Sequence, residues 1–299
     1  MWQQYLQDIA KNDFKSIARC ISLIENEVPG YEDLLQNLPA EKNSPVIGIT
    51  GPPGAGKSTL TNALIALLVA QQKKVAVLCI DPSSPFNLGA LLGDRIRMSE
   101  WYNSQNVFIR SLATKGSLGG LHPKVIEITD LLKAAAFDYI LVETVGVGQS
   151  EIEIAGLADT TIVVLVPESG DEIQSMKSGL MEIADIFVVN KADRPGAEVF
   201  IKNLHTMLSP VFKQDRINVP VIKTIADKNI GVEVLLDKIQ QQVTTKNTER
   251  KQLLLVEKAY QLLQAKRMQG ISKALIKKEI ENNDGVFNLY RFVASYGND

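Results

Sequence analysis

The stretch GITGPPGAGKSTL, residues 48–60, decides the fold. It lies between two apolar runs, 45–47 and 64–68, so a strand, a glycine-rich turn and a helix are expected in succession. The spacing Gly51-x-x-x-x-Gly56-Lys57-Ser58 is that of a phosphate-binding loop, whose glycines let backbone N–H groups approach phosphate oxygens. The helix that follows adds the positive end of its dipole. This stretch therefore predicts a nucleotide-binding α/β domain.

Every residue of the motif is a candidate for phosphate binding. The predicted contacts are Gly51, Pro52, Pro53, Gly54, Ala55, Gly56, Lys57, Ser58 and Thr59. We expect Lys57 to reach the β- and γ-phosphates and act in catalysis, and Ser58 to place its hydroxyl on Mg²⁺. The alternative is a glycine-rich turn without a ligand, but all fixed positions match in the expected context, which favours the phosphate site.

The rest of the chain predicts an α/β architecture with helical ends. Seven short β-branched runs alternate with helical patterns, at 46–50, 75–80, 107–109, 139–142, 161–166, 186–189 and 219–222. Such alternation predicts a mostly parallel sheet sandwiched by helices, the P-loop NTPase class. Helical spacing dominates the two ends, and 253–280 is expected to be helical and rich in charge. We divide the chain into an N-terminal helical extension (1–43), a P-loop domain (44–244) and a C-terminal helical segment (245–299).

Composition narrows the classes of partner. Of the 299 residues 45% are hydrophobic, and the formal net charge is −2, which favours neither nucleic acid nor an anionic membrane. No apolar run reaches the roughly 18 residues of a membrane-spanning helix. The two cysteines, Cys20 and Cys79, are far apart and expected to be buried thiols. We expect a cytoplasmic protein without a nucleic-acid or membrane partner.

The stretch FVVNKAD, residues 187–193, predicts the base that is bound. It follows an apolar strand, so Asn190, Lys191 and Asp193 are expected at the carboxyl edge of the sheet, where ligands bind. The Asp193 carboxylate can accept hydrogen bonds from N1–H and the amino group of guanine, whereas adenine would leave it unpaired. Asn190 and Lys191 would brace the loop and the base. The pattern predicts GTP or GDP; its alternative is an ordinary polar turn.

A later strand precedes a second candidate for base recognition. Thr224, Ile225 and Ala226 are expected to supply the backbone contact to O6 of guanine. They differ from the usual Ser-Ala form of this contact.

The stretch YILVETVGVGQSE, residues 139–151, predicts a metal-binding and water-binding region. Glu143 ends an apolar strand and can hold Mg²⁺ through a water, and Gly146 can donate its N–H to a γ-phosphate. Gln149 either orients the attacking water or is a switch-loop residue without a direct part in catalysis. We assign catalysis to Lys57, Glu143, Gly146 and Gln149. No arginine finger is identifiable in the chain, so slow intrinsic hydrolysis is expected.

Two further acids extend the predicted Mg²⁺ site. Asp81 ends the second strand, and Asp94 follows thirteen residues later across a glycine-containing loop that can close over the metal. Alternatively, Asp81 caps a turn before Pro82 and Asp94 pairs with Arg95 or Arg97. The predicted metal set is Ser58, Asp81, Asp94 and Glu143.

The motifs GPPGAGKSTL, DPSS with LLGDRIRM, KGSLGGL, LVETVGVGQSE, GDEIQSMKSG and NKAD resemble those of the MeaB/ArgK family, over roughly residues 44–225. The resemblance implies a GTPase chaperone that gates cofactor loading onto, and protects, an adenosylcobalamin-dependent acyl-CoA mutase of the methylmalonyl-CoA mutase type. It also implies a homodimer, slow hydrolysis stimulated by the mutase, and a third switch coupled to it. The third-switch residues are Asp171, Glu172, Gln174 and Lys177. From the residues alone, the two acids could equally be a favourable helix N-terminus.

Two other classes compete with this interpretation. A GTPase that inserts a metal into another enzyme would carry a His- or Cys-rich tract, whereas this chain has two histidines and two cysteines. An ATP-using kinase or transport-associated ATPase would bind adenine, which Asp193 disfavours. One departure from the family lies at residues 85–90, PFNLGA, where the family has a hydroxyl- and glycine-rich stretch.

Overall fold

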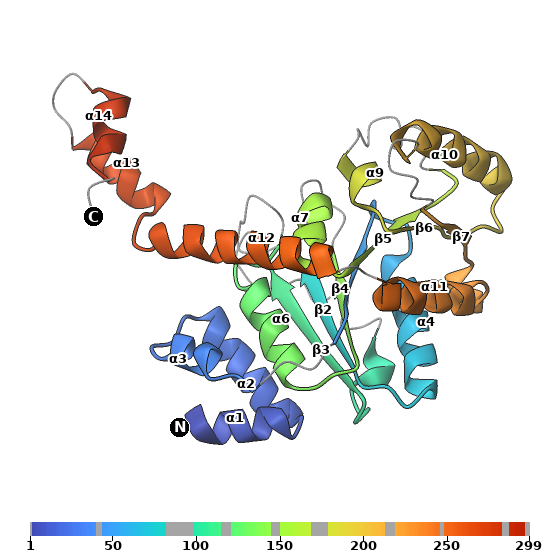
Figure 1. Ribbon diagram of the computed structural model, residues 1–299, viewed down its shortest axis with the longest axis horizontal. Helices are drawn as coiled ribbons and strands as arrows, with labels where there is room; N and C mark the ends of the chain where they lie inside the picture. Colours follow the sequence, from blue (N-terminus) through green and yellow to red (C-terminus); the bar gives the residue numbers. More distant parts are fainter. Residues whose placement is uncertain are drawn as a thin grey trace. The chain divides into compact units, whose positions relative to one another are not determined.

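The computed structural model describes residues 2–39, 44–81, 98–114, 121–144, 150–168, 179–212, 219–245, 248–282 and 287–296. A seven-stranded sheet has the order β3-β2-β4-β1-β5-β6-β7, and all its neighbouring strands are parallel (Figure 1). The strands are β1 (Val46–Thr50), β2 (Val75–Asp81), β3 (Val107–Ala113), β4 (Tyr139–Glu143), β5 (Thr160–Leu165), β6 (Ile186–Val189) and β7 (Val221–Lys223). The expected P-loop NTPase sheet is confirmed, and each of the seven predicted runs forms a strand.

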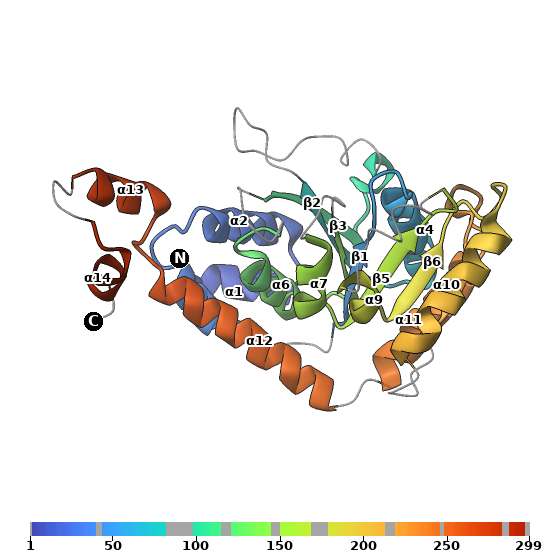
Figure 2. The same cartoon turned by 90° about the horizontal axis from the view of Figure 1, so that it is seen from above.

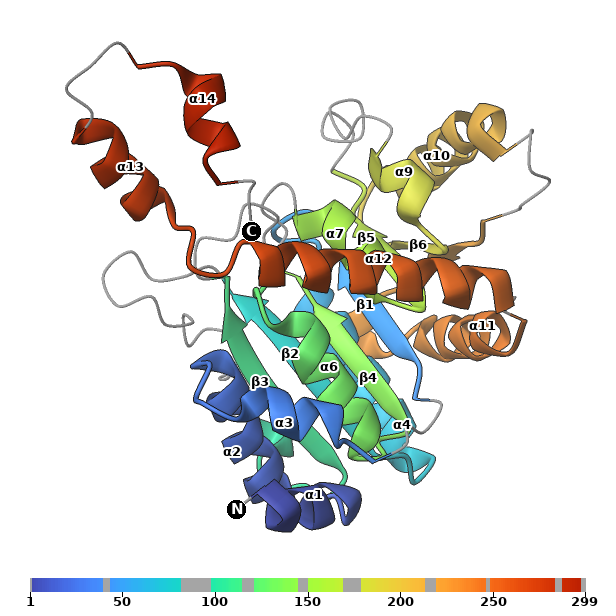
Figure 3. The same ribbon diagram turned by 60° about the vertical axis from the view of Figure 1, so that its left-hand side comes forward.

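Helices cover both faces of the sheet. One face carries α1 (Trp2–Ala10), α2 (Phe14–Glu25), α3 (Tyr31–Gln36), α6 (Val125–Ala134), α7 (Ser150–Leu157), α9 (Gly179–Ile183) and α10 (Ala197–Phe212). The other carries α4 (Lys57–Ala70) and α11 (Val232–Thr245). Alternate residues of the strands feed the hydrophobic clusters on the two faces of the sheet, as the two-residue period of a strand requires. Figure 3 shows α6 in front of β2 and β4, with α4 behind the sheet.

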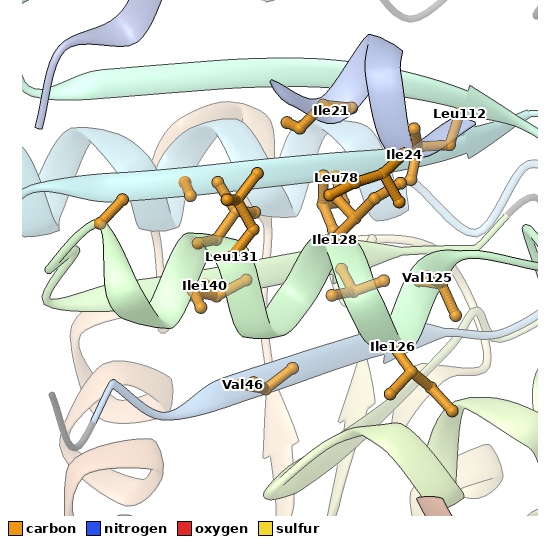
Figure 4. Packing of buried hydrophobic residues seen from close by; sticks show 14 of the residues in the cluster. Ile21, Ile24, Val46, Leu78, Leu112, Val125, Ile126, Ile128, Leu131 and Ile140 are labelled. Carbon is orange, nitrogen blue, oxygen red and sulfur yellow. The ribbon is translucent and has the colours of Figure 1, made fainter. Parts of the chain in front are cut away.

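The N-terminal helices share their core with the sheet. Ile21 and Ile24 of α2 pack in the same buried cluster as Leu78 of β2 and Ile128 of α6 (Figure 4). The views of Figures 1 and 2 agree in placing α1 and α2 beside α6. Burial of such aliphatic side chains stabilises the fold by about 1.5–3 kcal/mol each, so the extension adds to the stability of the sheet domain.

Polar contacts also join the N-terminal helices to the sheet domain. Lys124, which precedes α6, places its ammonium 3.0 Å from the Glu27 carboxylate, 3.0 Å from the Tyr31 hydroxyl and 3.3 Å from the Glu127 carboxylate. Burial alone would lower the pKa of Lys124, but these oxygens outweigh it and raise the pKa. The lysine therefore stays charged and ties the extension to the start of α6.

The chain forms two compact units, residues 1–251 and 252–299. The second unit contains most of α12 (Thr248–Arg267) and all of α13 (Lys273–Glu281) and α14 (Leu289–Ala294). The expected helical stretch 253–280 falls in two helices, α12 and α13, because α12 ends before Gly270, whose φ is +85°. Ser272 then starts α13, since its hydroxyl accepts the N–H of Leu275 at 3.0 Å.

None of the described helices is both long and apolar enough to cross a bilayer.

Candidate nucleotide-binding site

The phosphate loop joins β1 to α4, and two of its glycines are required by space and by backbone conformation. Gly51 has φ +135°, and a Cβ there would lie 2.1 Å from the carbonyl oxygen of Val164 on β5. Gly56 has φ +88°, and a Cβ there would lie 2.4 Å from the amide nitrogen of Asn190. Residues other than glycine rarely adopt these dihedrals. The phosphate loop packs closely against β5 and against residues 190–193, the predicted base loop, so both positions require glycine.

Lys57 begins α4 and folds back over the loop. Its ammonium donates to the carbonyl oxygens of Gly51 at 2.8 Å and Pro52 at 2.9 Å, and the side chain is buried. The charge therefore lies against the loop predicted to hold the phosphates, where a low dielectric strengthens its field.

Glu143 ends β4 and faces the helix that follows the loop. Its Oε1 accepts from the Ser58 hydroxyl at 2.6 Å, and its Oε2 accepts from the Thr61 hydroxyl at 2.9 Å. All three side chains are buried. The two expected metal ligands Ser58 and Glu143 are thus brought together, although they are 85 positions apart in the sequence.

Asp81 lies on the same face of the sheet as Glu143. Glu143 pairs with Cys79 of β2, and Asp81 follows Cys79 by two residues, so their side chains share a face. Asp81 is buried, and its carbonyl oxygen accepts the N–H of Thr114 at 3.0 Å. Ser58, Asp81 and Glu143 present hydroxyl and carboxylate oxygens, the donor set that Mg²⁺ prefers, so the residues fit this ion.

Asn190 connects the base loop to its surroundings. Its amide nitrogen donates to the carbonyl oxygen of Ala55 in the phosphate loop at 2.9 Å. Its Oδ1 accepts from the Thr224 hydroxyl at 3.0 Å and from the Ala226 N–H at 3.1 Å. The predicted base-binding segments 190–193 and 224–226 therefore meet beside the phosphate loop. The expected bracing role of Asn190 corresponds to these contacts.

Lys191 and Asp193 lie at the more exposed side of the same loop. Lys191 has φ +54°, and its ammonium donates to the carbonyl oxygen of Gly54 at 2.7 Å. Asp193 accepts from the Lys228 ammonium at 2.9 Å. This hydrogen bond lowers the pKa of the Asp193 carboxyl, which therefore stays ionised at neutral pH. An ionised carboxylate can accept from two N–H groups of a guanine ring.

Other predicted residues lie outside the described part of the chain. They are Asp94, Gly146, Gln149, Asp171, Glu172, Gln174 and Lys177, together with the divergent stretch 85–90.

Sequence reasoning missed two contacts of the predicted site residues. Thr61 follows Ser58 by three positions, so both hydroxyls lie on the face of α4 that meets Glu143. That spacing was a usable signal. Lys228 lies in the 3₁₀ turn η2 (Ala226–Lys228), and its contact with Asp193 spans 35 positions, for which no local pattern gives a signal.

Several curated proteins and solved structures are similar to this chain. A protein of Pyrococcus abyssi named as a GTPase is 45% identical over 245 residues, which cover 81% of this chain and 76% of that one. A fused isobutyryl-CoA mutase of Geobacillus kaustophilus is 36% identical over 237 residues, which cover 75% of this chain and 22% of that one. The crystal structure of a LAO/AO transport system kinase matches with a TM-score of 0.71 and 25% identity, over 95% of this chain and 87% of that one.

The family comparison covers most of the chain. Residues 17–283 match the model described as methylmalonyl-CoA mutase-associated GTPase MeaB. The resemblance that the sequence motifs suggested is thereby confirmed, and a bound guanine nucleotide is the ligand expected of such a family. The chain belongs to the MeaB family of GTPases.

Proposed function

We propose that this protein binds and slowly hydrolyses GTP as a chaperone of an adenosylcobalamin-dependent acyl-CoA mutase. In this role it gates loading of the cofactor onto the mutase and protects the loaded enzyme. The observation that carries the nucleotide part is the position of Asn190, which joins the base loop to Ala55 of the phosphate loop. The client part is supported by membership in the MeaB family.

A relative supports the choice of client. The segment similar to this chain makes up 22% of a protein named as a fused isobutyryl-CoA mutase. In that relative, a domain of this kind and a mutase therefore belong to one polypeptide. We propose that this chain likewise associates physically with an acyl-CoA mutase. We propose a separate mutase chain as the client of this protein.

The buried groups at the phosphate loop are suited to the chemistry. Lys57 would bind the phosphates, because its ammonium already lies on the loop carbonyls. Ser58, Asp81 and Glu143 would hold Mg²⁺, which when bound offsets the negative charge that develops on the phosphates. Backbone N–H groups of the loop would stabilise the same charge. The Asp193 carboxylate would accept hydrogen bonds from the guanine ring.

We further propose that the protein is a homodimer formed through α12. Leu253, Val256, Tyr260 and Leu263 recur at intervals of three, four and three residues, and each is between 57% and 66% exposed. This a/d spacing is the seam that pairs two helices in a coiled coil. We expect Val256→Glu with Leu263→Glu to lower the mass measured by light scattering from twice the chain mass of 32.9 kDa to the chain mass itself. A variant that stays dimeric would exclude this helix as the interface.

The function is tested by measuring GTP and ATP hydrolysis by the purified protein, alone and with purified cobalamin-dependent mutases. We expect slow hydrolysis of GTP that rises at least about tenfold with the client mutase, and a GTP dissociation constant far below that for ATP. Equal affinity for ATP would overturn the guanine assignment. GTP binding without stimulation by any acyl-CoA mutase would overturn the assignment of the client.

A further inference from the structure

The carboxylate of Glu143 is held at both oxygens by one helix. Ser58 donates to Oε1 at 2.6 Å and Thr61 donates to Oε2 at 2.9 Å, both from α4. Ser58 is part of the phosphate-loop motif, whereas Thr61 lies beyond it. The carboxylate of a glutamate ends a side chain with three rotatable bonds. The Thr61 hydroxyl adds a second contact that restrains rotation of this carboxylate.

The hydroxyl of Thr61 has two acceptors for its one hydrogen. Besides Glu143, the carbonyl oxygen of Lys57 lies 2.9 Å away, one helical turn earlier. A bond to an ionised carboxylate is about twice as strong as a bond to a neutral carbonyl, so Glu143 is the preferred acceptor. Thr61 is fully buried, which leaves no water to replace its hydroxyl.

We propose that Thr61 is a positioning residue for Glu143 and thereby sets the affinity of the nucleotide complex for Mg²⁺. Thr61 holds Oε2, so Oε1 and the Ser58 hydroxyl stay aimed together at the metal position. Groups that orient a metal ligand in this way typically change metal affinity by about 10–100-fold when they are removed. This inference rests on the proposed function, because it takes Ser58 and Glu143 as metal-site residues.

The test compares three variants of the full chain. Thr61→Val keeps the shape but removes the hydroxyl, and Thr61→Ser restores a hydroxyl. Thr129→Val is the matched control, because Thr129 is also fully buried on a helix and donates to the carbonyl one turn earlier, Val125, at 2.6 Å. The readout is the Mg²⁺ dissociation constant of the GDP complex, measured with Mn²⁺ competition by electron paramagnetic resonance. GDP affinity in EDTA is measured alongside.

We expect Thr61→Val to weaken Mg²⁺ binding at least about tenfold while GDP affinity in EDTA stays within about twofold. Thr61→Ser and Thr129→Val should both bind Mg²⁺ like the unaltered protein. If Thr61→Val does not fold, Thr61→Ala provides the same measurement. A dissociation constant within about twofold of the unaltered protein, or an equal loss in Thr129→Val, would overturn the proposal. Failure of the unaltered protein to bind GDP would instead overturn the proposed function, and this inference with it.

Discussion

The two ends of the predicted site hold their carboxylates in opposite ways. At the phosphate end, Glu143 is 3% exposed and accepts from two hydroxyls of α4. At the base end, the Asp193 side chain is 42% exposed and accepts a hydrogen bond from the ammonium of Lys228, also an exposed side chain, at 2.9 Å. One acid is fixed by the core before any ligand arrives, whereas the other faces solvent.

This difference in burial predicts different functions for the phosphate end and the base end. Buried polar groups are costly to move and strongly coupled to their partners, so the phosphate end is preorganised for charge stabilisation. An exposed ion pair contributes little on its own and is screened by salt. The base end therefore gains its discrimination only when the ring of the nucleotide covers Asp193. Substitutions should accordingly cost more at the phosphate end.

Two lysines give the most direct contrast, because each donates to a carbonyl of the phosphate loop. Lys57 is buried and contacts Gly51 and Pro52, and Lys191 contacts Gly54 from the exposed side. We expect Lys57→Ala to lower the rate of GTP hydrolysis at least about 1,000-fold, because a charge that stabilises the transition state is lost. Lys191→Ala should lower it no more than about tenfold. Single-turnover hydrolysis of saturating GTP measures both, and equal losses would contradict the contrast.

Asn190 is a buried residue of the base end, so its substitution should cost as much as one at the phosphate end. Its replacement by alanine leaves the Ala55 carbonyl, the Thr224 hydroxyl and the Ala226 N–H without their partner at Asn190. We expect Asn190→Ala to lower the free energy of unfolding by about 2–4 kcal/mol, since several buried groups lose hydrogen bonds. Urea denaturation measures this loss. Asp193→Ala is the control and should leave the urea midpoint close to that of the unaltered protein, as is usual for surface substitutions.

Asp193 should affect nucleotide choice rather than stability. An asparagine at this position can donate to the 2-carbonyl of xanthine but cannot accept from both N–H groups of guanine. We expect Asp193→Asn to weaken GTP binding about 100-fold and to improve binding of xanthosine triphosphate, because a buried mismatch at a polar group is costly. Equilibrium titration with both nucleotides gives the two dissociation constants. Unchanged binding of xanthosine triphosphate would contradict the direct contact with guanine.

The sequence was sufficient for the sheet and for local motifs. The seven β-branched runs became seven strands, because strands that are buried on both faces of a parallel sheet read as nearly continuous apolar runs. The glycines of the phosphate loop were predictable because only that residue fits their dihedrals. The break in the C-terminal helices near Gly270 was missed, although Gly270 and Ser272 are ordinary stop and start signals.

Contacts between distant segments were harder to predict. The contact of Thr61 with Glu143 could have been predicted from the sequence, since Thr61 lies three residues after Ser58 on the same helix face. Lys228 was not, because its meeting with Asp193 depends on where β6 and β7 end in the folded sheet. Spacing along one element can be read from a sequence, whereas register between elements requires the fold.

Substitution of Lys228 has the smallest expected effect, and it tests directly whether the two ends of the site hold their carboxylates differently. Its hydrogen bond lowers the pKa of Asp193, so the folded-state carboxyl stays ionised to lower pH than in the unfolded chain. Such a group stabilises the fold above its unfolded pKa, and the contribution is lost as pH falls through the lower folded pKa. In Lys228→Met the pKa of Asp193 should rise toward its ordinary value, which carbon-13 NMR of the carboxyl measures. At pH 7.5 the carboxyl is ionised in both proteins, so GTP affinity should change less than about threefold. A loss of tenfold or more at that pH would mean that the exposed pair positions Asp193 as firmly as the hydroxyls position Glu143, and the two ends would then work alike.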